Sequence, residues 1–295
     1  MAVMSVKSVS SGDARRAGCE QLSKAGITSA SLDTDLMLAS AMNVEYATIV
    51  SHAEILLSKT EELLFANHIR RRLRREPLAY IVGTREFYGI DLYVDPRVLI
   101  PRPATECLVD RALDWWTSTN RVPNSDSNAS LIVDVGVGSG AIALALATHL
   151  PAAVIVGSDI SRDAVKVAVH NAHRLGLQRQ AHIVVADFQP TTRLAPNLVV
   201  ANLPYIPTAE ISSLEPEICD FEPCCALSGG ADGFDLYRCF LDQVRVRPGG
   251  AVIVEIGYEQ ASLLSSVVQK VDSQLSLELT PDLEGFNRIG LISGW

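Results

Sequence analysis

The chain has no apolar run long enough to cross a lipid bilayer. Its most apolar stretch begins at Ala141 and ends before the polar pair Thr148 and His149, whereas a transmembrane helix needs roughly 18 to 20 apolar residues. The N-terminal residues also lack the apolar block of a secretory signal and the arginines of a transit peptide. We therefore expect a cytoplasmic protein that makes no use of a membrane.

The sequence also lacks the cysteine spacing of zinc and redox sites. Its six cysteines include no pair separated by two residues, so no metal site is expected. Cys224 and Cys225 are adjacent, but a disulfide between neighbours is strained. We expect both to be buried free thiols, as in a reducing compartment.

Cationic residues are outnumbered, with 25 Lys and Arg against 34 Asp and Glu, and the formal net charge is −9. Nucleic-acid affinity rests largely on Lys and Arg, so a nucleic-acid partner is disfavoured. One basic cluster stands out, formed by Arg70, Arg71, Arg72, Arg74 and Arg75. The pattern predicts the solvated face of a helix that points Ala66, Ile69 and Leu73 inward, with a partner-docking patch as the alternative.

At 295 residues the chain exceeds the usual size of one domain, so we expect two. Residues 13–75 carry the apolar periodicity of short helices, interrupted at Gly26 and at capping residues such as Ser58. Between 79 and 100 the period changes toward two, with β-rich runs at 80–82 and 92–94. This pattern predicts a small all-helical domain followed by a β-hairpin linker.

After Ser130, apolar strands alternate with helices in the manner of an α/β doubly wound sheet. Seven strands are predicted, the last two as an antiparallel hairpin at the sheet edge, over residues 131–135, 153–158, 182–186, 197–201, 251–256, 275–280 and 288–292. The fold class is therefore a Rossmann-like α/β domain that follows a helical one.

A glycine-rich loop connects the first of these strands to an apolar helix, and its residues are Asp134, Val135, Gly136, Val137, Gly138, Ser139 and Gly140. Small residues at a helix N-terminus let backbone N–H groups approach a nucleotide-like ligand. A tight structural turn or a nicotinamide site would explain the same pattern. The loop alone does not choose between them.

Polar and aromatic residues follow the next three strands. Asp159 has the position of a carboxylate that accepts both hydroxyl protons of a ribose, although it could also cap the following helix. Asp187 and Phe188 could bracket the edge and face of an adenine. The fourth strand is followed by Asn202, Leu203, Pro204 and Tyr205, at the sheet edge where open α/β sheets bind ligands.

With these motifs the sequence closely resembles the HemK/PrmC family of release-factor glutamine N5-methyltransferases. Besides the glycine loop, the resemblance rests on the segments Glu-Pro-Leu-Ala-Tyr-Ile at 76–81, Glu-Phe-Tyr-Gly at 86–89, Leu-Ile-Pro-Arg-Pro at 99–103, Phe-Glu-Pro at 221–223 and Gly-Gly-Ala-Asp-Gly at 229–233. It implies a helical substrate-docking domain at 1–78, a hairpin linker at 79–100 and a seven-stranded methyltransferase domain at 101–295. The implied cofactor is S-adenosylmethionine. The implied partner is a class 1 peptide release factor, methylated on the glutamine of its Gly-Gly-Gln loop, and a monomer is the default oligomeric state.

The resemblance also implies roles for individual residues. The cofactor would contact Asp134, Gly136, Val137, Gly138, Ser139, Gly140, Asp159, Asp187, Phe188 and Asn202. Asn202, Leu203, Pro204 and Tyr205 would form the pocket for the substrate amide. If Asn202 Oδ1 and the Leu203 carbonyl accept the two N–H protons of that amide, its lone pair can point at the methyl group, and both bonds strengthen as positive charge develops on nitrogen. Tyr205 would stack on the planar amide, and neither a histidine base nor a metal is required.

Two positions depart from the family pattern. Leu203 stands where the family has proline, and Ala104 stands where it usually has an acidic residue. Leucine keeps the backbone carbonyl but predicts a looser turn and a slower enzyme than a proline version. Three alternatives stay open at this point: methylation of a ribosomal-protein glutamine, methylation of adenine in nucleic acid, and a non-catalytic protein that only binds S-adenosylmethionine.

Overall fold

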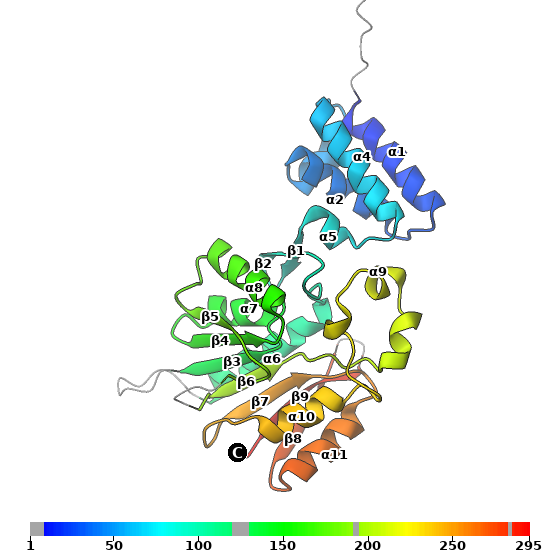
Figure 1. Ribbon diagram of the computed structural model, residues 1–295. Coiled ribbons are helices and arrows are strands. Elements are labelled where there is room, and N and C mark those ends of the chain that lie inside the picture. Colours follow the sequence, from blue (N-terminus) through cyan, green and yellow to red (C-terminus); the bar gives the residue numbers. More distant parts are fainter. Residues whose placement is uncertain (1–8, 120–129, 191–194, 283–284) are drawn as a thin grey trace, which may run out of the picture. The chain divides into compact units, whose positions relative to one another are not determined.

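The computed structural model describes residues 9–119, 130–190, 195–282 and 285–295 (Figure 1). The chain forms two compact units, one made of residues 1–83 with 215–221 and the other of residues 84–214 with 222–295. The domain boundaries predicted at 78 and 100 stay predictions. The assignment of 215–221 to the helical unit was not expected from the sequence.

Among the described residues, no helix combines the length and the apolar character that a membrane span requires.

The first unit is helical, as predicted. It contains α1 (Ser11–Lys24), α2 (Ala30–Met42), α3 (Tyr46–Ser51), α4 (Lys59–Leu73), α5 (Leu78–Val82) and the later α9 (Pro216–Cys219). Leu22, Leu38 and Phe65 are among the buried side chains of its core. Helix α4 begins with a reciprocal capping box between Ser58 and Glu61, which satisfies two otherwise unpaired backbone donors.

The strand predicted at 80–82 is wrong, because these residues lie in α5. Tyr80 and Ile81 are buried, and Gly83 ends the helix in the left-handed conformation at φ 79°. Burial in the helical core outweighs the β preference of the short run Tyr-Ile-Val. The hairpin itself exists and begins later, with β1 (Thr84–Phe87) paired antiparallel to β2 (Ile90–Tyr93).

The basic cluster on α4 is largely engaged within the helical unit. Arg72 is 7% exposed, and its guanidinium pairs with Asp33 Oδ2 at 2.6 Å and with Glu217 Oε1 at 2.8 Å. Arg75 pairs with the other oxygen of Glu217, and Arg71 pairs with Glu76. The predicted solvated face is therefore wrong for Arg72, because its carboxylate partners lie on α2 and, far along the chain, on α9.

The second unit is built on a seven-stranded sheet with the order β5-β4-β3-β6-β7-β9-β8. Its strands are β3 (Leu131–Val135), β4 (Val154–Asp159), β5 (Ala181–Val185), β6 (Leu198–Ala201), β7 (Ala251–Glu255), β8 (Ser276–Pro281) and β9 (Asn287–Ser293). The first five are parallel, and β8 and β9 form the predicted antiparallel hairpin at the edge. The predicted Rossmann-like architecture is confirmed.

Helices cover both faces of this sheet (Figure 1). On one face α6 (Glu106–Ser118), α7 (Ala141–His149) and α8 (Arg162–Arg174) share a core that contains Leu108 and Leu144. On the other, α10 (Asp235–Gln243) and α11 (Ala261–Val271) pack around Phe240 and Leu264. From β3 the chain continues to β4 and β5 on one side, and it then crosses to β6 on the other side of β3. Open α/β sheets bind ligands at such a switch point.

Candidate active site

A cleft opens at the carboxyl ends of β3, β4, β5 and β6, and all of its lining residues belong to the second unit. Those that the sequence predicted are Gly136, Gly138, Asp159, Asp187, Phe188, Asn202, Leu203 and Pro204. With the other lining residues they surround a space of about 860 Å³, including the part open to solvent.

The glycine loop can lie close to the cleft because its glycines have no side chains. Its backbone N–H groups are hydrogen-bonded within the protein. The amides of Gly136 and Val137 both donate to the Ser158 carbonyl at 2.8 Å, and Gly140 donates to Val137. The Gly138 amide donates to Asp159 Oδ2 at 3.0 Å. These four amides are therefore engaged within the protein, and contact of the loop with a ligand stays a prediction. Gly136 and Gly138 have φ values of 78° and 53°, which favour glycine.

Several residues predicted to contact the cofactor lie behind the cleft wall. Val137 and Ser139 are almost completely buried, and Asp134 is fully buried. A Cβ atom on Gly140 would come within 2.9 Å of Leu144 Cδ1, so this glycine allows the loop to pack on α7. These four residues are not part of the cleft lining.

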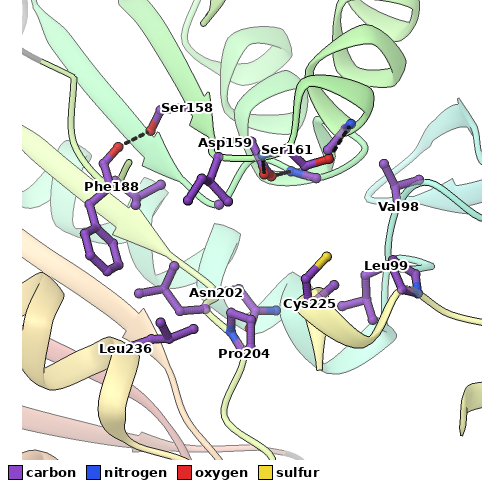
Figure 2. A pocket seen from close by; sticks show the side chains of 18 of the residues that line it. Val98, Leu99, Ser158, Asp159, Ser161, Phe188, Asn202, Pro204, Cys225 and Leu236 are labelled. Atoms are coloured by element: carbon purple, nitrogen blue, oxygen red, sulfur yellow. Dashed lines mark hydrogen bonds between the residues drawn. The ribbon is translucent and has the colours of Figure 1, made fainter. Parts of the chain in front are cut away.

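Asp159 faces the cleft from the end of β4, and its carboxylate is held by backbone donors. Oδ2 accepts from Gly138 and Oδ1 accepts from the Ser161 amide at 2.8 Å (Figure 2). The cap of α8 is Ser161, whose side chain accepts from the Ala164 amide. Each carboxylate oxygen has a further lone pair, so Asp159 can still accept ribose hydroxyl protons.

Phe188 lies against the cleft in a strained backbone conformation. Its φ is 54°, which is uncommon for a bulky residue. The Ser158 hydroxyl donates to the Phe188 carbonyl at 2.7 Å (Figure 2). The ring of Phe188 contacts that of Phe240. Strained residues that are held by their surroundings cluster at functional sites. The position is suited to stacking on an adenine.

Asn202 extends the cleft beyond the cofactor region, directly after β6. Its side-chain NH2 group donates to Thr105 Oγ1 at 3.1 Å and to Glu255 Oε2 at 3.0 Å. The Tyr205 hydroxyl donates to Glu255 Oε1 at 3.2 Å, and Tyr205 is not part of the cleft lining. Burial raises the pKa of the Glu255 carboxyl. Its environment is almost free of water.

Residues that the sequence left without a role complete the cleft. Val98, Leu99, Pro223, Cys225 and Leu236 line it, and several of them belong to the Leu-Ile-Pro-Arg-Pro and Phe-Glu-Pro segments or adjoin them (Figure 2). Glu222 joins the two segments, because it accepts from the Ile100 amide at 3.2 Å and pairs with Arg102. Both segments belong to the family resemblance, and this was the only sign in the sequence that they have a role.

Cys224 and Cys225 are free thiols, as expected, but the prediction that they are buried is wrong. Both side chains are exposed, and Cys225 faces the cleft. The segment around them forms a short 3-10 helix (Cys224–Ala226) rather than a core element.

Leu203 occupies its unusual position with two supporting contacts. Its amide donates to the Tyr237 hydroxyl at 3.0 Å, and its side chain is 5% exposed, close to Gly136. Proline has no N–H group and would lose the hydrogen bond. The hydrogen bond argues against a looser turn, so we expect Leu203→Pro to lower the turnover number between about twofold and tenfold, a loss of roughly 0.5 to 1.5 kcal/mol. Steady-state methylation would check this, and a faster proline variant would restore the sequence-based expectation.

Asp134 provides a test of pH dependence. Burial raises the pKa of its carboxyl to about 7, against an ordinary value near 4. Between these values the folded protein keeps a proton that the unfolded chain has lost, so the free energy of unfolding falls as pH rises. Between roughly pH 5 and pH 8, we expect the free energy of unfolding of Asp134→Asn to fall by about 2 kcal/mol less than that of the parent protein. Denaturant titrations of both proteins would measure it, and equal pH dependence would contradict the shift.

The cleft presents groups that can bind S-adenosylmethionine. The Asp159 carboxylate can accept from ribose hydroxyls, and the Phe188 ring can stack on an adenine. The residues therefore fit the implied cofactor.

Comparisons with known proteins bear on the family and the fold. Residues 13–83 match the family model of the PrmC N-terminal domain, and residues 115–222 match that of ribosomal protein L11 methyltransferase. The release factor glutamine methyltransferase of Bradyrhizobium diazoefficiens is 37% identical over 93% of this chain and 92% of its own length. That of Geobacter sulfurreducens is 39% identical over 81% of each chain. Among solved structures, the fold is shared by the hMettl16 catalytic domain, solved in complex with the MAT2A 3'UTR hairpin 1. The TM-score is 0.55 at 10% identity, and the match covers 83% of this chain and 84% of that one.

Proposed function

Because this chain belongs to the release factor glutamine methyltransferase family, we propose that it methylates the N5 side-chain nitrogen of the glutamine in the Gly-Gly-Gln loop of a class 1 peptide release factor. S-adenosylmethionine supplies an electrophilic methyl group on its sulfonium sulfur. Such an enzyme acts in the cytoplasm, where translation ends.

The observation that carries the proposal is the orientation of Asn202. Both N–H groups of its side chain donate to protein acceptors, so Oδ1 is the polar atom left for a ligand at the cleft. An acceptor beside the cofactor region suits a substrate that presents an NH2 group. The Leu203 carbonyl, one residue on, is the proposed second acceptor.

These two acceptors address the main obstacle of the reaction. An amide nitrogen is a poor nucleophile because its lone pair is delocalised, so the site must orient it. Acceptors for both N–H protons fix the amide plane and stabilise positive charge as it develops on nitrogen. Orientation of this kind is worth on the order of 7 to 11 kcal/mol in well-aligned model systems.

Asp159 and Phe188 are proposed to hold the ribose and the adenine, with Gly136, Gly138 and Asp187 beside them. Asp134, Val137, Ser139 and Gly140 would then support the loop from behind the cleft wall, as their burial suggests. Pro204 lines the cleft and is proposed to shape the substrate pocket directly, whereas Tyr205, whose hydroxyl is engaged with Glu255, would shape it indirectly.

The test is incubation of the purified protein with S-adenosylmethionine and a class 1 release factor, followed by intact-mass measurement. We expect the release factor to gain the mass of one methyl group. A ribosomal protein and an adenine-containing oligonucleotide serve as competing substrates in the same assay. Preferential methylation of either would overturn the assignment of the substrate.

A further inference from the structure

A buried carboxylate lies directly behind the proposed amide pocket. Glu255 ends β7 and is 1% exposed, and it neighbours Asn202 because β6 and β7 are adjacent parallel strands, with Val254 opposite Ala201. Burial of a carboxylate is costly unless its oxygens are hydrogen-bonded. The fold alone does not require such a group at this position of the sheet.

The hydrogen-bond partners of Glu255 are the residues proposed to hold the substrate. Oε2 accepts from the Asn202 NH2 group at 3.0 Å, and Oε1 accepts from the Tyr205 hydroxyl at 3.2 Å. One carboxylate therefore connects the first and last residues of the Asn-Leu-Pro-Tyr turn from its buried side.

This contact fixes which way the Asn202 amide faces. The two ends of an asparagine amide are nearly identical in shape, and they are distinguished by their hydrogen-bond partners. Both Glu255 oxygens act as acceptors, Oε2 for the Asn202 NH2 group and Oε1 for the Tyr205 hydroxyl, so this contact selects the NH2 end of Asn202 over its oxygen end. Thr105 Oγ1 accepts the second N–H at 3.1 Å. The oxygen end is consequently directed to the ligand.

We propose that Glu255 is a positioning residue, which acts through Asn202 to keep an acceptor oxygen facing the substrate and so selects a substrate group that donates hydrogen. The proposal rests on the proposed function. The hydrogen bond from Asn202 to Glu255 also polarises the amide, which strengthens the bond that Oδ1 accepts, because linked hydrogen bonds reinforce one another.

The test reverses the direction of the Glu255–Asn202 hydrogen bond. In Glu255→Gln, the glutamine NH2 can face Asn202 and let its amide turn, so we expect the turnover number to fall about tenfold with unchanged cofactor affinity. In Asn202→Asp, two carboxylates face each other and the turnover number should fall further. In the double variant, the introduced glutamine donates to the introduced aspartate, which again directs an oxygen to the substrate. We expect the turnover number of this double variant to exceed that of Asn202→Asp at least fivefold.

The readouts separate positioning from a role in folding alone. Thermal unfolding and cofactor titration accompany the turnover number and the KM for the release factor, and Glu259→Gln is the matched control because Glu259 is exposed near the same strand end. The control should match the parent. The proposal would be overturned if the turnover number of the double variant, relative to the parent, is at or below the product of the relative turnover numbers of the two single variants. So would parental turnover in Glu255→Gln, while an inactive parent would overturn the proposed function as well.

Discussion

Replacing Asn202 with alanine is expected to lower the turnover number by roughly a hundredfold or more. The reason is that removal of one oriented polar contact to a transition state costs about 2.7 to 4 kcal/mol in well-studied enzymes. Asn202 presents one oxygen to the cleft, while Thr105 and Glu255 hold its other end. Single-turnover methylation of the release factor would measure the effect.

Cofactor affinity should change little in the same variant, because the ribose and adenine contacts are assigned to other residues. Gln274→Ala is the matched control, since it removes an exposed amide from the same unit. It should leave both the turnover number and the cofactor affinity at parental values. Near-normal turnover in Asn202→Ala would remove Asn202 from the mechanism.

Replacing Asp159 with alanine is expected to weaken cofactor binding about a hundredfold. A hydrogen bond to a charged group contributes about 1.5 to 3 kcal/mol, and this carboxylate can accept two from a ribose. The variant also leaves the Gly138 and Ser161 amides without their acceptor, which loosens the glycine loop. Isothermal titration with S-adenosylhomocysteine would give the affinity.

The matched control for this second variant is Asp163→Ala. Asp163 is an exposed carboxylate in the first turn of α8, paired with Lys166 on the surface. Its removal should leave the affinity unchanged. If both variants bind the cofactor equally well, the cleft around Asp159 does not hold the ribose.

Much of the architecture could be predicted because it follows from local patterns. The alternation of apolar strands and helices after Ser130 determines the parallel sheet, and the strand ends place Asp159, Phe188 and Asn202 at one edge. Periodicity identified the helical unit for the same reason. The failure at 80–82 came from a short run whose β preference was weaker than its burial in the helical core.

Contacts between residues far apart in the sequence could not be predicted in this way. The partners of Arg72 lie on α2 and α9, and no pattern around α4 indicates them. The same holds for Glu255, which resembles an ordinary strand end until β6 places it beside Asn202. The pairing of the Leu203 amide with Tyr237 likewise depends on tertiary structure.

The account depends on a pair of acceptors that hold a side-chain NH2 group at the cleft. Tandem mass spectrometry of a methylated class 1 release factor tests this most directly, because it locates the added group on a single residue. We predict one methyl group on the side-chain nitrogen of the glutamine in the Gly-Gly-Gln loop, formed roughly a hundredfold more slowly when the protein carries Asn202→Ala. Methylation of a lysine or a carboxylate, or methylation of the glutamine at the parental rate in that variant, would contradict the account.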